Sequence, residues 1–102
     1  MKIQFSENKI RIRFSEEEAH ALHANGCISL PNEVLSSQLC LGNENQATLK
    51  LNVLNLTVIK NDFIDFLKEK REHYVFVKEK IEISIEKDLA HFKNGFAIQL
   101  CS

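Results

Sequence analysis

The N-terminal part of the chain contains two short runs in which apolar and polar side chains alternate. The runs are Lys2–Ser6 and Lys9–Phe14, and a two-residue period is typical of a strand with one buried face. Because only residues 7–8 separate the runs, we expect an antiparallel hairpin. The alternation stops at Ser15, which together with Glu18 forms the Ser-x-x-Glu capping box of a helix start.

The segment after this hairpin is predicted to be a short helix followed by irregular β structure. The Asn-Gly pair at positions 25–26 suits the left-handed end of a helix. Residues 27–31 form a short strand-like run that ends at proline, which cannot donate to a central ladder. Residues 34–41 are compatible with a strand or with a loop leading into one. Residues 42–46 have the composition of a turn.

The middle of the chain alternates again and then changes to helical spacing. Residues 47–53 alternate as a strand does, and a turn at residues 54–55 would return the chain so that Leu56 and Val58 join the same apolar face. Leucine is a poor residue for such a tight turn.

A second helix is predicted to begin at a cap formed by Asn61 or Asp62. Its apolar residues fall at the spacing i, i+3 and i+4: Phe63, Phe66 and Leu67.

Two more strands are predicted near the C-terminus, His73–Lys78 and residues 80–88, joined at Glu79. In the second strand one face is apolar (Ile81, Ile83, Ile85) and the other polar (Glu82, Ser84, Glu86). Residues 89–95 allow one helical turn. We favour the alternative, a hairpin at residues 94–95, because Phe96, Ile98 and Leu100 keep a strict two-residue period.

These elements predict one α+β domain over residues 1–102, with a mostly antiparallel sheet of about six to eight strands and two short helices. The expected order is β-β-α-β-β-β-β-α-β-β. The sequence contains no visible internal repeat.

Composition and charge narrow the classes of partner. The chain is 44% hydrophobic, which suffices for an ordinary core, and 14 acidic residues balance 13 basic ones to a net charge of −1. Duplex nucleic acid and anionic membranes are usually met by a clear basic excess, so we expect neither as a partner.

The cysteines and the lack of long apolar stretches allow a prediction of the protein's cellular location. Cys27, Cys40 and Cys101 are odd in number and have no metal-type spacing, so we expect three free thiols in a reducing environment. No signal peptide and no membrane-spanning segment is predicted. The expected location is therefore cytoplasmic.

One candidate metal site lies on the first predicted helix. Glu16, His20 and His23 can share a face there, with Cys27 just beyond the helix end. Two or three ligands without a second motif are more typical of surface histidines. No resident cofactor is predicted.

A strip of cations on the second predicted strand is the other candidate site. Lys9, Arg11 and Arg13 lie opposite its apolar face and can bind a phosphate or carboxylate, or pair across the sheet with Glu82 and Glu86. We favour the cross-strand pairing.

Lys87 continues the inward phase of the last predicted strand, so it should lie at the rim of the core. A buried lysine with a lowered pKa is a candidate catalytic group, although a rim lysine without a known partner is common. The sequence shows no nucleophile elbow, no Gly-rich phosphate loop and no base-stacking platform.

Residues 1–18 and 80–92 resemble the two ends of a family of short bacterial proteins of unknown function. That family opens with a basic hairpin (MKIRI, then NSIR-RL) and a Ser/Thr-x-x-Glu-Val turn, and it closes with a strand ending in Glu-Lys-Asp-Phe. Ala19, Leu89 and His91 depart from the family's pattern. The resemblance implies a compact, partly antiparallel β domain and no activity, and it draws attention to the polar residues that match: Arg11, Arg13, Glu86, Lys87 and Asp88.

The leading functional hypothesis is a small non-catalytic module that binds a protein partner or itself, as a homodimer, through a strand edge at residues 27–31 or 96–101. The alternative is a binder or enzyme for a small anionic ligand that uses Arg11, Arg13 and Lys87. A metal site on the first helix is the third hypothesis.

Overall fold

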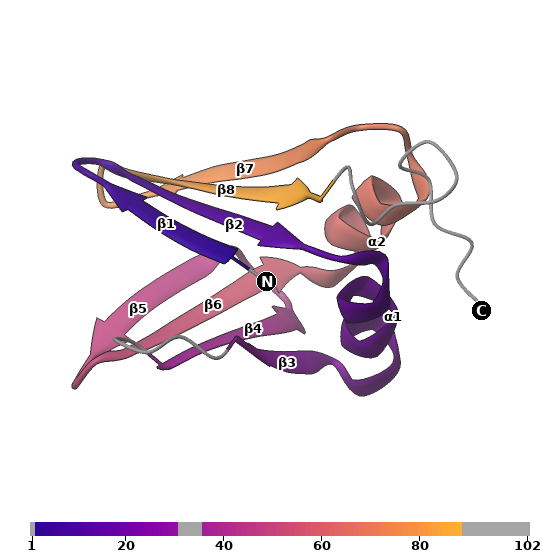
Figure 1. Ribbon diagram of the computed structural model, residues 1–102, viewed down its shortest axis with the longest axis horizontal. Helices are drawn as coiled ribbons and strands as arrows, with labels where there is room; N and C mark the ends of the chain where they lie inside the picture. Colours follow the sequence, from indigo (N-terminus) through magenta and orange to yellow (C-terminus); the bar gives the residue numbers. More distant parts are fainter. Residues whose placement is uncertain (1, 31–35, 89–102) are drawn as a thin grey trace.

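The computed structural model describes residues 2–30 and 36–88, which form eight strands and two helices (Figure 1). The elements are β1 (Lys2–Ser6), β2 (Lys9–Phe14), α1 (Glu16–Asn25), β3 (Cys27–Leu30), β4 (Ser36–Gly42), β5 (Gln46–Lys50), β6 (Val53–Ile59), α2 (Lys60–Lys68), β7 (His73–Lys78) and β8 (Ile81–Lys87). The predicted α+β class and the predicted order of elements are both confirmed. The predictions for residues 89–102 lie outside the described residues.

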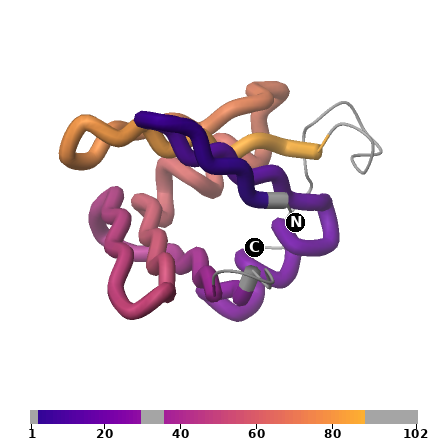
Figure 2. The backbone as a smooth tube through the Cα atoms, turned by 60° about the vertical axis from the view of Figure 1, so that its left-hand side comes forward, coloured from indigo at the N-terminus to yellow at the C-terminus, as the bar shows by residue number. Residues whose placement is uncertain are grey.

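The strands form two sheets, whereas the sequence predicts one. Their orders are β1-β2-β8-β7 and β3-β4-β6-β5. Each sheet consists of two antiparallel hairpins, and the two inner strands, β2 with β8 and β4 with β6, run parallel. The sheets lie face to face as two layers, with both helices at one end and three of the hairpin turns at the other (Figures 1 and 2). A single sheet of eight strands would leave one of its faces without an apolar cover.

The hydrophobic core lies between the two sheets and extends to the helices at one end of them. It draws on the inward face of both parallel pairs, and its fully buried residues include Ile12, Leu39, Leu56 and Ile85. An aromatic cluster closes the helical end of this core; its members are Phe14, Phe63, Phe66 and Tyr74, with neighbouring ring centroids 5.1–6.3 Å apart.

The predicted caps of α1 are confirmed. The Ser15 hydroxyl accepts a hydrogen bond from the Glu18 amide at 3.2 Å, and the Glu18 carboxylate accepts one from the Ser15 amide at 3.1 Å. Gly26 ends the helix with φ of +80°, a left-handed conformation that costs glycine little. Ala19 and Leu22 face the core.

The predicted cap of α2 is wrong. The helix begins at Lys60 directly after β6, so the N-cap is Ile59 and neither Asn61 nor Asp62. Ile59 has no side-chain hydrogen bond that caps the helix. The Asn45 side chain, from the segment before β5, instead accepts the Ile59 amide proton at 3.0 Å. A cap supplied from another element cannot be recognised by its position next to the helix.

Two hairpin turns place non-glycine residues in the left-handed region. Leu51 and Asn52 (φ 51° and 64°) turn β5 into β6, and Glu79 and Lys80 (φ 51° and 69°) turn β7 into β8. Positive φ at both central residues is typical of the tight turns that match strand twist. The turn predicted at residues 54–55 is therefore wrong, and the actual turn leaves Leu51 98% exposed.

The topology contains an internal repeat of the unit β-β-α-β-β. A shift of 44 positions takes β1, β2 and the start of α1 onto β5, β6 and the start of α2. A shift of 46 takes the starts of β3 and β4 to within one residue of the starts of β7 and β8, so that the Cys27–Cys40 register pair corresponds to His73–Glu86. The sequence shows no repeat because equivalent residues, such as Leu41 and Lys87, differ in chemistry.

Candidate functional site

The polar face of the β1-β2-β8-β7 sheet carries an ion-pair cluster. Arg11 on β2 donates two hydrogen bonds to Glu86 on the parallel neighbour β8, from Nε to Oε2 at 2.9 Å and from Nη2 to Oε1 at 3.1 Å. His73 Nδ1 on β7 lies 3.2 Å from Glu86 Oε1. Lys9 Nζ pairs with Glu82 Oε2 at 3.0 Å. The predicted cross-strand pairing is thereby confirmed.

Glu86 is held in its charged form. Glu86 is only 6% exposed. The hydrogen bonds from Arg11 lower the pKa of its carboxyl group, whereas burial raises it, and the net shift is downward. The positive charges of Arg11, His73 and Arg13 act in the same direction. The Arg11 guanidinium therefore already binds a carboxylate, because its Nε and Nη2 both donate to Glu86.

Lys87 lies on the opposite side of the same sheet and is buried, with 3% of its surface exposed. Its Nζ donates to the carbonyl oxygens of Phe66 at 2.8 Å and Glu69 at 2.6 Å, and it lies 4.5 Å from the centre of the Phe66 ring. Burial, followed by the charge of Arg71, lowers the pKa of the Lys87 amine to about 8. The amine therefore binds the carboxyl end of α2, where a cation is favoured.

The residues proposed for an anionic ligand do not converge. Arg11 and Arg13 project from the polar face of β2, whereas Lys87 projects into the core from β8. Asp88 continues the ladder beyond β8 by donating its amide to the Phe14 carbonyl at 2.9 Å. The sheet thus separates the cations that would have to bind one anion together.

The structure does not gather the predicted metal ligands either. Within residues 2–30 and 36–88, no three His, Cys, Asp or Glu side chains lie close enough together to hold a metal ion. His20 is exposed and His23 is half-buried on α1. Glu16, His20 and His23 therefore lack the geometry of a ligand set in this structure.

Cys27 and Cys40 form a disulfide across the β3–β4 pair. The expectation of three free thiols is therefore wrong for two of them, and Cys101 lies outside the described residues. The spacing of the cysteines does not predict this disulfide, because the two residues are 13 positions apart and are brought together by the register of β3 with β4.

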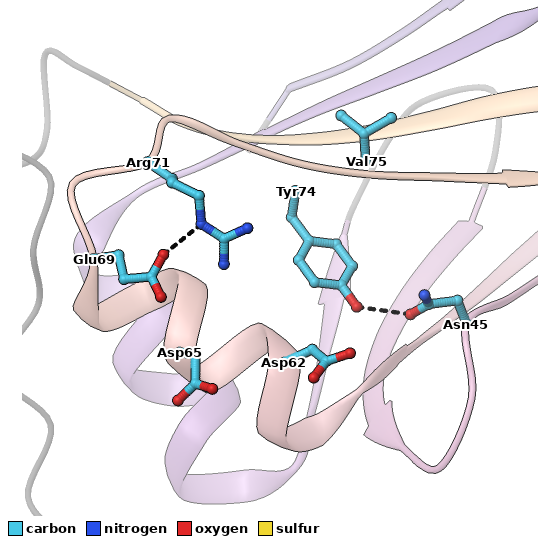
Figure 3. A pocket seen from close by; sticks show the side chains of 7 residues that line it. All are labelled: Asn45, Asp62, Asp65, Glu69, Arg71, Tyr74 and Val75. Atoms are coloured by element: carbon cyan, nitrogen blue, oxygen red, sulfur yellow. Dashed lines mark hydrogen bonds and ion pairs between the residues drawn. The ribbon is translucent and has the colours of Figure 1, made fainter.

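A partly open pocket of about 360 Å³ lies between α2 and β7 (Figure 3). Its polar lining comes from α2, from the loop after it, from β7 and from the segment before β5: Asn45, Asp62, Asp65, Glu69, Arg71 and Tyr74. The Tyr74 hydroxyl donates to Asn45 Oδ1 at 2.8 Å, which fixes the inner wall. Val75 contributes the rim, and its side chain points away from the pocket (Figure 3).

The pocket is acidic. Asp62 and Asp65 lie three positions apart on α2, so they share a face of the helix, and Glu69 is the C-cap residue that follows it. The Arg71 guanidinium lies between Glu69 and Tyr74 (Figure 3) and pairs with Glu69 at 2.5 Å. Asp62 and Asp65 have no ion-pair partner in the part of the chain that the structure describes. The pocket therefore suits a cationic group better than an anion.

The pocket lies beside the outer edge of β7. Among residues 2–30 and 36–88 no strand pairs with this edge, and the β7 residues between His73 and Lys78 carry no charge. The outward side chains of Val75 and Val77 are 50% and 65% exposed. Edge strands are usually protected by charges, proline or short length. The other outer strands are shorter than the six residues of β7: β1 and β5 have five residues each and β3 has four.

The sequence does not predict this pocket or this edge as a site. The spacing of Asp62 and Asp65 was a visible signal of one acidic helix face, and the alternation in His73–Lys78 was a visible signal of two exposed valines. What was missing is the outer position of β7, which depends on strand order.

Comparison with protein-family models, with curated protein sequences and with solved structures found no significant match for this chain. The resemblance to the family of short bacterial proteins stays a prediction. Neither helix in the described part of the chain has the length and apolar content needed to cross a membrane.

Proposed function

We propose that the protein is a non-catalytic binding module that accepts a strand from another polypeptide along the edge of β7. The single observation that carries this proposal is an outer strand with two half-exposed valines, Val75 and Val77, and no charged residue between its ends. Strand addition of this kind uses backbone hydrogen bonds for affinity and side-chain pockets for specificity. The acidic pocket that borders Val75 supplies such a specificity element.

The geometry gives less support to a small anionic ligand as the target. Arg11 already binds Glu86, and Lys87 binds carbonyl groups on the other side of the sheet. The pocket beside the exposed edge has three carboxylates and one guanidinium, so its net negative charge repels anions.

A labelled peptide with the sequence of residues 72–80 tests strand addition directly. We expect saturable binding by fluorescence anisotropy, and we expect at least about a tenfold loss of affinity in a Val75→Lys, Val77→Lys double variant, because lysine on an edge strand opposes pairing. The matched control carries Ser29→Lys and Thr48→Lys on the edge strands β3 and β5, both at exposed positions.

Two outcomes would overturn the proposal. One is the absence of peptide binding at millimolar protein concentration. The other is an equal loss of binding in both double variants, which would mean that lysine acts through the overall charge of the protein and that the β7 edge has no special role.

A further inference from the structure

We infer that the strand added to β7 is β7 of a second copy of this chain, and that the partner's Lys78 fills the acidic pocket beside Tyr74. This inference rests on the proposed function, because it needs β7 to accept a strand. It adds the identity of the partner, the register of the contact and the residue that completes the pocket.

Symmetry restricts how two identical strands can pair. Two antiparallel copies are related by a two-fold axis between one residue and its own equivalent, and directly opposite side chains lie on the same face of the sheet. The outward valines must then stay outward, and the inward residues Tyr74, Phe76 and Lys78 must stay inward. Only registers centred on a residue near the middle of β7 pair most of the strand.

Two such registers exist, and the side chains favour the one centred on Phe76. In this register Val75 is opposite the partner's Val77, and the same contact is repeated across the axis. Both exposed valines of each copy therefore gain an apolar neighbour across the new strand pair. In a register centred on Val75, Val77 would be opposite the partner's His73 and would stay poorly covered.

The Phe76 register also satisfies the charges. It places Tyr74 opposite the partner's Lys78, about 5 Å away between Cβ atoms as in other antiparallel pairs. Tyr74 lines the pocket, and the pocket also contains Asp62 and Asp65, which have no ion-pair partner among the described residues. A lysine side chain is long enough to bring its amine from that position to these carboxylates.

The pairing ends where β7 ends, because Glu79 and Lys80 have positive φ and form the turn into β8. A contact of two six-residue strands is small, so we expect a weak dimer with a Kd in the micromolar range or above.

Charge exchange tests the pocket contact by sedimentation velocity over about 10 µM to 1 mM protein. Lys78→Glu is expected to raise the dimer Kd at least about tenfold, because the symmetric contact is lost twice. Adding Asp65→Lys to Lys78→Glu should restore the Kd to within about threefold of the original. Lys50→Glu on β5 makes the same change of net charge away from β7 and should leave the Kd unchanged.

Cysteine pairing tests the register in a Cys101→Ser background. A mixture of Val75→Cys and Val77→Cys chains should form a crosslinked heterodimer, whereas Val75→Cys alone should not crosslink to itself. Efficient self-crosslinking of Val75→Cys would instead support the register centred on Val75 and would contradict the assignment of the partner's Lys78 to the pocket.

Failure of this inference is distinguishable from failure of strand addition. If the whole protein stays monomeric at 1 mM but still binds the peptide of residues 72–80 at β7, the edge accepts strands and a second copy is excluded. If a dimer forms but Lys78→Glu and Lys50→Glu affect it equally, the pocket contact is wrong. A monomer that binds no peptide contradicts both proposals.

Discussion

Arg11 and Glu86 lie 75 positions apart in the chain and form a two-point ion pair across the parallel strands β2 and β8, with N–O distances of 2.9 and 3.1 Å. Glu86 is almost fully buried although it lies on the polar face of its sheet. The pair thus links the β1–β2 hairpin to the β7–β8 hairpin. Its contribution depends on the charge of Glu86, which makes it accessible to titration.

Glu86→Gln should lower the free energy of unfolding at pH 7 by about 1–2 kcal/mol, because two charge-assisted hydrogen bonds lose the charge of their acceptor. The folded pKa of Glu86 lies below the ordinary value of 4.5, so the unfolded chain binds a proton at higher pH than the folded one does. The advantage of the unsubstituted protein should therefore be present above pH 4.5 and disappear as the pH falls through the lowered pKa.

Urea unfolding at several pH values between 2.5 and 7 measures this dependence. Glu82→Gln is the matched control, because both members of the Lys9–Glu82 pair are about two-fifths exposed (42% and 41%). We expect that control to change the free energy of unfolding by less than about 0.5 kcal/mol at any pH. A constant difference between Glu86→Gln and the original protein down to pH 2.5 would contradict the assignment.

Lys87 should make the protein more stable relative to a Lys87→Met variant as the pH rises from 8 to 9.5. The folded amine has a pKa of about 8 and the unfolded one of 10.5, so the unfolded state holds more protons in this interval. Stability therefore increases with pH through this group. The expected relative gain is about 1 kcal/mol, after allowance for partial solvent screening of the amine.

Thermal or urea unfolding of both proteins across pH 7–9.5 tests the Lys87 prediction. Lys68→Met, in the exposed last turn of α2, should follow the pH dependence of the original protein. If Lys87→Met does the same, the Lys87 amine titrates at its ordinary pKa and is hydrated in solution.

Asn45→Ala should destabilise the protein by about 1.5–3 kcal/mol, because two donors lose their shared acceptor. Asn45 Oδ1 accepts the Tyr74 hydroxyl at 2.8 Å and the Ile59 amide at 3.0 Å. Asn45→Asp keeps an oxygen at the same place and should retain more than half of that stability. Chemical unfolding of both variants measures the difference, and equal destabilisation by alanine and aspartate would show that the oxygen is unimportant.

The Cys27–Cys40 disulfide should leave at most one reactive thiol per chain when the protein is unfolded without a reductant. Closing a loop of 13 positions restricts the unfolded chain, and this restriction is worth about 3 kcal/mol in the chain-entropy description. A reductant should therefore lower the melting temperature of the original protein and leave a Cys27→Ser, Cys40→Ser variant unaffected. Three reactive thiols would mean that the protein exists in the reduced form.

The sequence predicts the orientation of several site residues individually, but it does not predict which of them lie together. The inward phase of Lys87 and the pairing of the β2 cations with Glu82 and Glu86 follow from the two-residue period, and the structure confirms both. The carbonyl partners of Lys87 belong to α2, and no local pattern relates the last strand to that helix. The same reason explains why Asn45, which bonds Ile59 from another element, was missed as a cap.

The helices and strands can be predicted from local sequence, because the signals for strands, capped helices and turns act between residues a few positions apart. Ser15, Glu18 and Gly26 set the ends of α1 in this way, and alternation set most of the strands. Tertiary structure alone decided that β2 pairs in parallel with β8 and β4 with β6, that two sheets form in place of one, and that β7 is an outer strand. Those choices depend on burying two apolar faces against each other at once, and this condition involves residues from the whole chain.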